Sequence, residues 1–569
     1  MESQPVRRAP RDEMPDPELS PESSATTRFT PDSDSDESDL EMGELSESFK
    51  LQKREKSGVD HAADDEDEER YHDAPGRRAS VSTVQSYQLY TPDEERAVVR
   101  KFDKRLVLFV ALLYMLSFLD RSSTASPICQ NELLLIVVDI GNAKIAGLEK
   151  DLDLDSNKYD WVLTAFYLAY ILFEWMSILW KIVPPHIYVT AIVLSWGIIA
   201  SLQSVATSFA GLLVLRILLG IGEAGFTGIP FYLSFFFKRE ELALRTGFFI
   251  SAAPLATSFA STLAYFIIML GKYLPIASWR LLFLIEGFPS VLIAVYCWHI
   301  IPDSPDTATY LTKREKKVAR LRLRKEKDPN APPEKRGLNL KQVLSALSDP
   351  KLYLTAFMFF FTNMAFSSLP VFLPTIIHEM GHTVLISQAL SAPPYLLSFI
   401  IVIFTAYLSD KMQNRSYFVI FHALLSAAGY AFLALAGKMG LGIWWRYAGI
   451  YPAAIGFFSV ITIIITWTIN NQESESKQGT GFAMLQLIGQ CGPLVGTRLY
   501  PEGDAPFYVT GMAVCAAAMV FVACLSGGLR VYLRWKNRVG SGEYGKIGDE
   551  GHTLVGNRGK VKEPFKYML

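Results

Sequence analysis

The sequence predicts an all-α membrane protein with twelve transmembrane helices in two halves of six. Half of the 569 residues are hydrophobic, the mean hydropathy is +0.20, and a charged segment separates two equal groups of apolar runs. A helix needs roughly 20 apolar residues to cross about 30 Å of hydrocarbon. We expect spans near residues 105–122, 159–180, 185–206, 209–236, 246–270, 281–301, 353–377, 385–408, 417–436, 443–468, 480–497 and 506–532.

The segment before the first apolar run is acidic and polar. Residues 1–100 carry 26 acidic against 13 basic residues. Runs such as DSDSDESDLE offer almost nothing to bury, so we expect residues 1–98 to form a disordered cytoplasmic tail without a cleaved signal peptide. The run RRAS, which ends at Ser80, fits a basophilic kinase site, and a chance match in a serine-rich linker is the other interpretation.

A basic segment divides the predicted bundle. From Asp303 to Lys351 there are 13 Lys or Arg and 7 acidic residues, and further basic residues gather in alternate connections. The positive-inside rule then places both termini in the cytoplasm. The predicted organisation is the tail at 1–98, a six-helix half at 99–301, a cytoplasmic loop at 302–351, a second half at 352–533 and a cytoplasmic tail at 534–569.

Several classes of function are disfavoured. The five cysteines lack metal-ligand spacing, so we expect neither a metal site nor a disulfide framework. No nucleotide-binding loop or nucleophile motif occurs in a soluble segment, so we expect no enzyme activity and no cofactor. The basic residues at 313–341 are interpreted as a helix that faces the membrane surface, not as a nucleic-acid site.

Charged residues inside the predicted spans are the functional candidates, because a charge at mid-bilayer costs roughly 2.5–3.5 kcal/mol. Asp120 and Arg121 end the first apolar run. Arg216 and Glu223 lie two helical turns apart in the fourth run, on one helix face and about 10 Å apart along the axis. Such a pair can line one cavity, although an ion pair that only joins helices is the alternative.

These charges suit proton-coupled transport of a small anion. An arginine stays protonated and binds carboxylate, sulfonate or sulfate oxygens through two parallel N–H groups. A neighbouring carboxylate releases that arginine once it is protonated, so proton and anion move together. Glu174 lies in the second apolar run and Glu286 in the sixth. For both, an ion pair that only joins helices and a role in transport are equally good interpretations. Asn470, at the end of the tenth run, either contacts substrate or caps its helix.

The motifs FLDRS (118–122), RILLGIGEAG (216–225), WRLLFLIEG (279–287) and NNQESESKQGTG resemble those of the allantoate permease family. This family is the fungal branch of the anion:cation symporters, within the major facilitator type of transporter. The resemblance covers roughly Lys101 to Leu533. The longer runs FYLSFFFKREELALRTG and SAAPLATSFAS look most like alternative sulfate transporters.

The resemblance implies a plasma-membrane protein that works as a monomer, with protons and a small anion as its partners. The anion would be sulfate, a sulfonate, allantoate or a vitamin carboxylate. By position, anion binding falls on Arg121 and Arg216, to which we add Asn470, proton coupling on Asp120 and Glu223, and gating on Asp410, Lys411 and Arg415. A proton antiporter that exports drugs or metabolites is the main alternative, although the glycines of its usual fifth-helix motif are absent from Ile250–Ala256. A nutrient sensor is the second alternative.

One stretch departs from the family pattern. Between FLDRS and IGNAKIAGL the family has a single Asn, whereas this chain has the seventeen residues from Ser123 to Asp139. A retained intron is one explanation, because an excision that starts within the codon of Ser123 and ends within that of Asp139 would keep the frame and restore the Asn. A genuine insertion beside the first helix is the other explanation.

Overall fold

The computed structural model describes residues 90–122, 148–271, 273–324, 337, 339–379, 384–496, 498–500, 504, 507–551 and 565–569, and every regular element in these ranges is helical. The first part contains α3 (Pro92–Phe102), η1 (Asp103–Val107), α4 (Leu108–Ser122), α6 (Leu148–Leu152), α7 (Ser156–Phe173), η2 (Glu174–Lys181), α8 (Pro185–Leu202), η3 (Gln203–Val205), α9 (Phe209–Ala224), η4 (Gly225–Gly228), α10 (Ile229–Leu233), α11 (Leu242–Gly271) and α12 (Ser278–Ile300). The second part contains α13 (Lys313–Arg324), α14 (Leu340–Leu347), α15 (Pro350–Glu379), α16 (Val384–Met412), α17 (Ser416–Met439), α18 (Ile443–Asn470), α19 (Glu475–Gly489), α20 (Gly492–Gly496) and α21 (Val509–Gly551).

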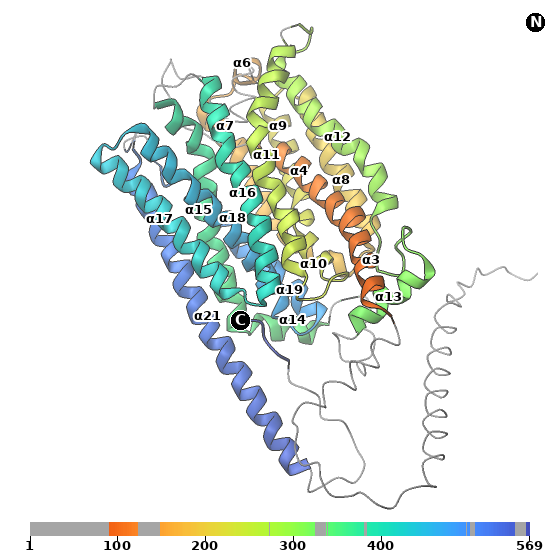
Figure 1. Cartoon of the computed structure of the whole chain (residues 1–569). Helices are drawn as coiled ribbons and strands as arrows, with labels where there is room; N and C mark the ends of the chain where they lie inside the picture. The colour runs from red at the N-terminus through yellow and green to blue at the C-terminus, as the bar shows by residue number, and fades with distance from the viewer. Residues whose placement is uncertain are drawn as a thin grey trace, which may run out of the picture. The chain divides into compact units, whose positions relative to one another are not determined.

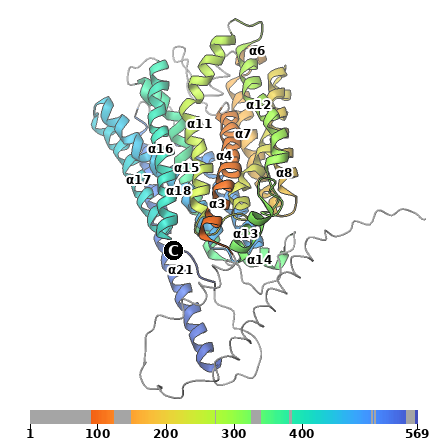
Figure 2. The same cartoon turned by 45° about the vertical axis from the view of Figure 1, so that its right-hand side comes forward.

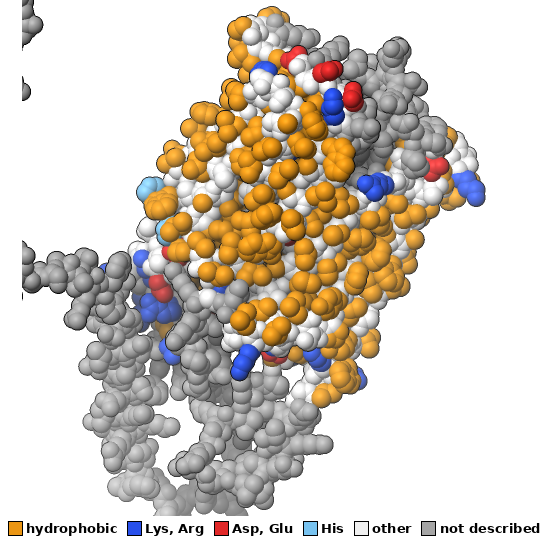
Figure 3. Space-filling view, turned by 180° about the vertical axis from the view of Figure 1, so that it is seen from behind, with side chains coloured by type: hydrophobic (Ala, Val, Ile, Leu, Met, Phe, Trp, Pro, Cys, Tyr) orange, Lys and Arg blue, Asp and Glu red, His pale blue; other side chains and the backbone are white. Residues whose placement is uncertain are grey.

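Eight helical stretches in the described residues are long and apolar enough to cross a membrane. They are Pro185–Val205, Phe209–Leu233, Leu242–Ala260, Ser278–Ile300, Leu390–Met412, Ser416–Met439, Trp444–Asn470 and Val509–Ser541, and each coincides with a predicted apolar run. In Figure 3, hydrophobic side chains cover the middle of the face, whereas charged side chains lie mainly toward its two ends. This distribution confirms the prediction of an all-helical membrane protein, because a lipid-facing surface must be apolar between its two polar ends.

The helices pack as two groups that follow the order of the chain (Figures 1 and 2). In the first group, α12 packs on α8, α7 on α9, and α4 on α11. In the second, α17 packs on α18 and α21, and α15 on α19 and α20. The groups meet where α11 packs on α16 and where η2 packs on α19. We call the end of the bundle that carries α13 and α14 the basal end (Figure 1).

Regular structure extends into segments that were expected to be tails or a loop. Helix α3 begins at Pro92, inside the predicted tail, because the Thr91 hydroxyl accepts the Glu94 N–H while the Glu94 carboxylate accepts the Thr91 N–H. This reciprocal cap, with Pro at the first helical position, starts a helix well. The basic loop contains α13 and α14, and α21 continues to Gly551 without a break at the expected boundary of 533.

Helix α13 is held to the basal end by charged groups. The Arg322 side chain is fully buried, and its Nη1 donates to the carbonyl of Phe236 at 3.0 Å. Its guanidinium also pairs with Glu241 and, at 3.2 Å, with Glu95 of α3. Lys238 reaches the same Glu95 carboxylate at 2.5 Å. These contacts join α3 and α13 to the first group of helices.

Candidate substrate cavity and basal gate

A cavity lies between the two groups of helices. Its empty volume, opening included, is about 620 Å³. Helices α4, α7, α10 and α11 with η4 form one wall, and α15, α18 and α19 form most of the other. The lining residues are Tyr114, Phe118, Tyr170, Thr227, Pro230, Phe249, Ile250 and Ala253 from the first group and Phe359, Asn363, Phe366, Phe458, Ile461, Ile465, Gln486 and Gln490 from the second.

Aromatic rings dominate these walls. Tyr114 stacks on Phe249, with ring centroids 4.3 Å apart. On the opposite wall, Phe366 packs edge-on against Phe458 at 5.3 Å. Rings that are already packed in this way present fixed apolar surfaces, against which a flat ligand can stack.

The polar groups of the described lining are hydroxyls and amides. Asn363 Nδ2 donates to the carbonyl of Gly489 at 3.2 Å, which orients this amide. Gln486 is buried, and its Oε1 has no hydrogen-bond partner among the described residues. A buried amide oxygen in this state favours a bound donor. Lys, Arg, Asp and Glu are absent from the described lining.

One carboxylate touches the cavity wall from behind. Thr227 lines the cavity, and its hydroxyl donates to Glu174 Oε1 at 2.9 Å. Glu174 is fully buried where α7 tightens into η2. From the sequence, a structural ion pair and a functional acid are equally good interpretations of Glu174. The contact with Thr227 could not be read from the sequence, because Thr227 comes from a different helix.

Arg216 and Glu223 are both fully buried on α9, but neither lines the cavity in the described part of the chain. The Arg216 guanidinium lies over the Phe283 ring of α12 at 5.3 Å. Asp120 and Arg121 fall in the last turn of α4, and their side chains lie outside the described residues, as do Ser80 and the stretch from Ser123 to Asp139. The roles predicted for all of these residues stay predictions.

The residues of the expected gating motif lie at the basal contact between the two groups. The Asp410 carboxylate accepts the N–H groups of Ala243 and Leu244 at 3.2 and 2.7 Å, at the start of α11. It also pairs with Arg415 at 2.6 Å. Backbone N–H groups at a helix start are unsatisfied within the helix, so this carboxylate caps a helix of the other group. Lys411 is exposed to solvent.

Further bonds cross between the groups at the same end. Arg415 Nη2 and Asn470 Nδ2 both donate to the carbonyl of Arg239, at 3.1 and 2.9 Å. The buried Lys181 donates to Ser476 at 3.0 Å. We call these contacts, together with those of Asp410, the basal gate. Asn470 therefore lies in the gate and is not among the residues that line the cavity.

Two packed helical groups, a cavity between them and a closed contact at one end form the architecture of a secondary transporter. The sequence matches the Major Facilitator Superfamily over residues 110–497, and the chain belongs to this family. It is a multi-pass membrane protein, and members of this family are generally transporters and not enzymes.

Known proteins with similar sequences are fungal transporters. The MFS transporter prlL of a fungal species is 32% identical, covering 84% of this chain and 95% of its own. The high-affinity nicotinic acid transporter of Saccharomyces cerevisiae is 28% identical, covering 83% of this chain and 82% of its own. The fold is similar to that of the proton:xylose symporter XylE bound to 6-bromo-6-deoxy-D-glucose, with a TM-score of 0.54, 14% identity, and 76% and 96% of the two chains covered.

Proposed function

We propose that this protein takes up a small organic anion together with protons, and that the anion binds in the cavity between the two groups of helices. The observation that carries this proposal is the cavity itself, which is walled by both groups and lies beside a closed gate. A site shared by two rocking groups can be exposed to one side of the membrane at a time, as alternating access requires.

A ring-bearing carboxylate suits this cavity better than sulfate does. Sulfate is a compact dianion that needs many N–H donors, whereas the described walls offer mainly aromatic surface and a few amides. A flat ring gains stacking contacts on such walls, and the amides can bond its carboxylate or a ring nitrogen. The name of the yeast relative supports this class, since nicotinic acid is a flat ring that carries a carboxylate.

The charge of the anion needs a cation that the described lining lacks. Arg121 and Arg216 are our candidates, and either would have to meet the anion beyond the described walls or during rocking. Asp120 and Glu223 are the predicted proton carriers. Glu174 joins them, because its carboxylate bonds a hydroxyl that lines the cavity. Protonation of this carboxylate would change how Thr227 is presented to the ligand.

The proposal extends to how the chain lies in the membrane. We infer twelve spans, in which α4, α7 with η2, α15, and α19 with α20 join the eight apolar ones. The basal end, with its basic segments, faces the cytoplasm, and the plasma membrane is the expected location. Export by antiport and ligand sensing without net transport remain the competing functions, and uptake measurements separate them.

The test is uptake of radiolabelled nicotinic acid and of radiolabelled sulfate by yeast cells that express the chain. We expect nicotinic acid uptake that rises as external pH falls and collapses with a protonophore. Lower accumulation than in control cells would indicate export, and unchanged accumulation would indicate sensing. Saturable sulfate uptake that flat carboxylates do not inhibit would refute the proposed substrate class.

A pair of variants separates a binding role of Arg216 from a structural role. Arg216→Ala should abolish uptake, whereas Arg320→Ala, on the exposed side of α13, should leave it unchanged. Binding of the acid to the purified variant should also weaken at least about 100-fold more than binding of its uncharged amide, because loss of a desolvated charge pair costs about 3 kcal/mol or more. An equal loss for both compounds would mean that Arg216 only supports the fold.

A further inference from the structure

The last described residues of the chain, Phe565–Leu569, lie on the basal gate. We call them the 565–569 segment. They follow a stretch outside the described residues and have no helical structure of their own. Tyr567 and Leu569 nevertheless pack against the buried core of the bundle.

Two asparagines bind the backbone of this segment. Asn537 of α21 donates to the carbonyl of Tyr567 and accepts its N–H, both at 2.9 Å. Asn471 does the same for Met568, at 3.0 and 2.8 Å. Paired bonds of this kind hold an extended peptide whatever its side chains are, as a neighbouring β-strand would.

Side-chain contacts add selectivity. The Tyr567 hydroxyl donates to Glu473 at 3.2 Å, and Lys351 lies 4.6 Å from the centre of the Tyr567 ring. Trp467 Nε1 donates to the carbonyl of Met568 at 2.9 Å. Such contacts favour an aromatic residue at position 567.

The segment touches both groups of helices. In the second group, the N–H groups of Arg415 and Ser416 donate to the carbonyl of Leu569. In the first group, Arg239 lies over the Phe565 ring at 4.4 Å and donates to the carbonyl of Lys566 at 3.2 Å. Arg239 is also the residue whose carbonyl accepts the bonds from Arg415 and Asn470 within the gate.

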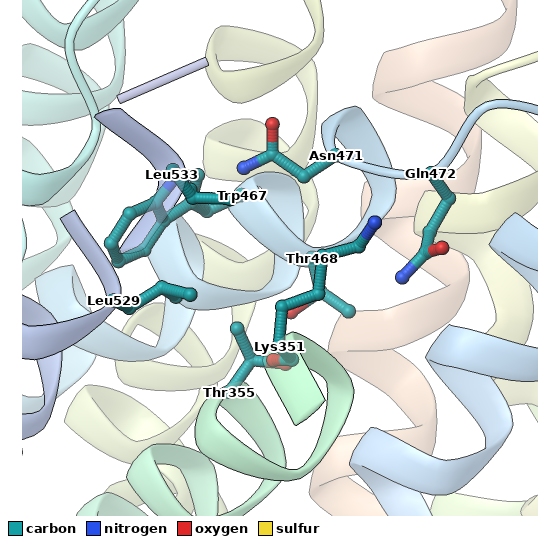
Figure 4. Close-up of a pocket in the computed structure, with 8 residues that line it drawn as sticks. All are labelled: Lys351, Thr355, Trp467, Thr468, Asn471, Gln472, Leu529 and Leu533. Carbon is teal, nitrogen blue, oxygen red and sulfur yellow. The ribbon is translucent and has the colours of Figure 1, made fainter. Parts of the chain in front are cut away.

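A small pocket lies beside the docked segment. Figure 4 shows it among side chains of α15, α18 and α21, with Asn471 and Gln472 at the end of α18. Three of its lining residues, Lys351, Trp467 and Asn471, also contact the segment. The segment therefore occupies a built site and does not rest on a flat surface.

We propose that this site is a peptide-binding site whose ligand is the 565–569 segment, and that the bound segment is a latch that keeps the basal gate closed. When the halves separate at the basal end, Arg239 moves away from Asn471 and Asn537. The segment then loses its contacts with one of the two groups of helices. Because all of its contacts are made only in the closed state, its binding energy favours the closed gate. Transport is slower while the segment is bound and faster after its release.

The test is hydrogen exchange followed by mass spectrometry on the purified chain, without substrate. The reporters are the amides of Ala243 and Leu244, which bond to Asp410 and have no bond to the segment. Four proteins are compared: the full chain, a chain ending at residue 564, Asn537→Ala, and the control Arg538→Ala, whose side chain is exposed and next to Asn537.

We expect exchange of the two reporter amides to become at least about tenfold faster on truncation. Asn537→Ala should cause a smaller change in the same direction, since it removes two of the hydrogen bonds that hold the segment. Arg538→Ala should match the full chain. Unchanged reporter exchange in the truncated chain would overturn the latch. This readout does not need a transported compound, so the proposed function can fail while the latch stands.

A second variant tests the binding site itself. In Asn537→Cys with Tyr567→Cys, oxidation should form a disulfide that slows reporter exchange, and a reductant should restore it. The pair Arg538→Cys with Tyr567→Cys is the control and should cross-link far less. Equal cross-linking of the two pairs would mean that the segment does not occupy this site.

Discussion

Asp410→Asn is expected to open the basal gate. The wild-type carboxylate accepts two N–H groups from the start of α11 and pairs with Arg415, whose side chain is fully buried. The pair with Arg415 lies within the second group, so its loss alone favours neither state of the gate. The two bonds to α11 cross between the groups, and a hydrogen bond to a charged group is worth about 1.5–3 kcal/mol. Loss of the charge and of one of these bonds should cost about 3 kcal/mol, which corresponds to a roughly 100-fold change in an equilibrium constant. The bonds to α11 join the two groups of helices, so the cost falls on the closed state.

The assay is a disulfide across the gate. Ser234 and Gln478 come from opposite groups, and their side chains lie 3.4 Å apart. With both changed to Cys, in a background where the accessible Cys491 and Cys524 are Ser, cross-linking reports the closed state. Asp410→Asn should slow cross-linking strongly.

The control for this assay is Met412→Gln, in the exposed residue two positions after Asp410. It should leave the rate of cross-linking unchanged. If Asp410→Asn cross-links as fast as its parent, the carboxylate does not hold the gate, and our reasoning about the motif is wrong.

Three further predictions concern the ion pairs of Arg322 and Glu95 at the basal end and the cavity residue Gln486. Arg322→Gln should destabilise the protein by about 3–5 kcal/mol because it breaks buried ion pairs. The control Arg320→Gln, in an exposed ion pair, should cost no more than about 1 kcal/mol. Thermal unfolding measures the stability of both variants. Burial raises the pKa of Glu95, but its ion pairs with Lys238 and Arg322 outweigh this and hold the pKa below the ordinary 4.5. The contribution of Glu95 to the free energy of unfolding is therefore complete above pH 4.5 and is lost as pH falls through the lowered pKa. The difference in unfolding midpoint between the parent protein and Glu95→Gln should shrink in acid. A difference that grows in acid would contradict this reasoning. Gln486→Leu should raise the KM for a ring carboxylate about tenfold, and an unchanged KM would place the ligand elsewhere.

The helices could be predicted from the sequence because lipid imposes a simple rule on composition. Each of the eight apolar helices coincides with a run that was expected from length and hydropathy alone. Helix α3 was missed, since seven of its eleven residues fall inside the predicted tail. Its only signal was the pattern of Thr91, Pro92 and Glu94, which is a local start signal with no apolar run to mark it.

The basal contact between the two groups contains residues that the sequence had singled out. Asp410, Lys411 and Arg415 form a short motif, and Asp410 and Arg415 lie at the contact between the two groups, while their role in gating stays a prediction. The sequence left two interpretations of Asn470 open, a helix cap and a substrate contact, because it lies at the end of its apolar run. Its bond to the carbonyl of Arg239 depends on how the second group meets the first, which no local pattern encodes.

The cavity could not be predicted in the same way. Its aromatic residues come from five helices, and in each helix they look like ordinary core or lipid-facing residues. Hydropathy cannot distinguish a ring that faces a ligand from one that faces another helix. The charged residues drew attention because a charge in lipid is rare, yet the described lining is neutral.

Charged side chains hold the basal gate, whereas the described lining of the cavity is neutral. At the basal gate, Asp410 and Arg415 bond to backbone groups and to each other, so they stabilise one conformation of the protein itself. In the cavity, the described rings and amides would bind the flat part of the proposed ligand, and Arg121 or Arg216 would meet its charge beyond these walls. A transporter gains from this separation, because the groups that hold the gate closed are then different from those that recognise the cargo. The 565–569 segment adds to the gate alone, and its release would change the rate of transport without changing what is transported.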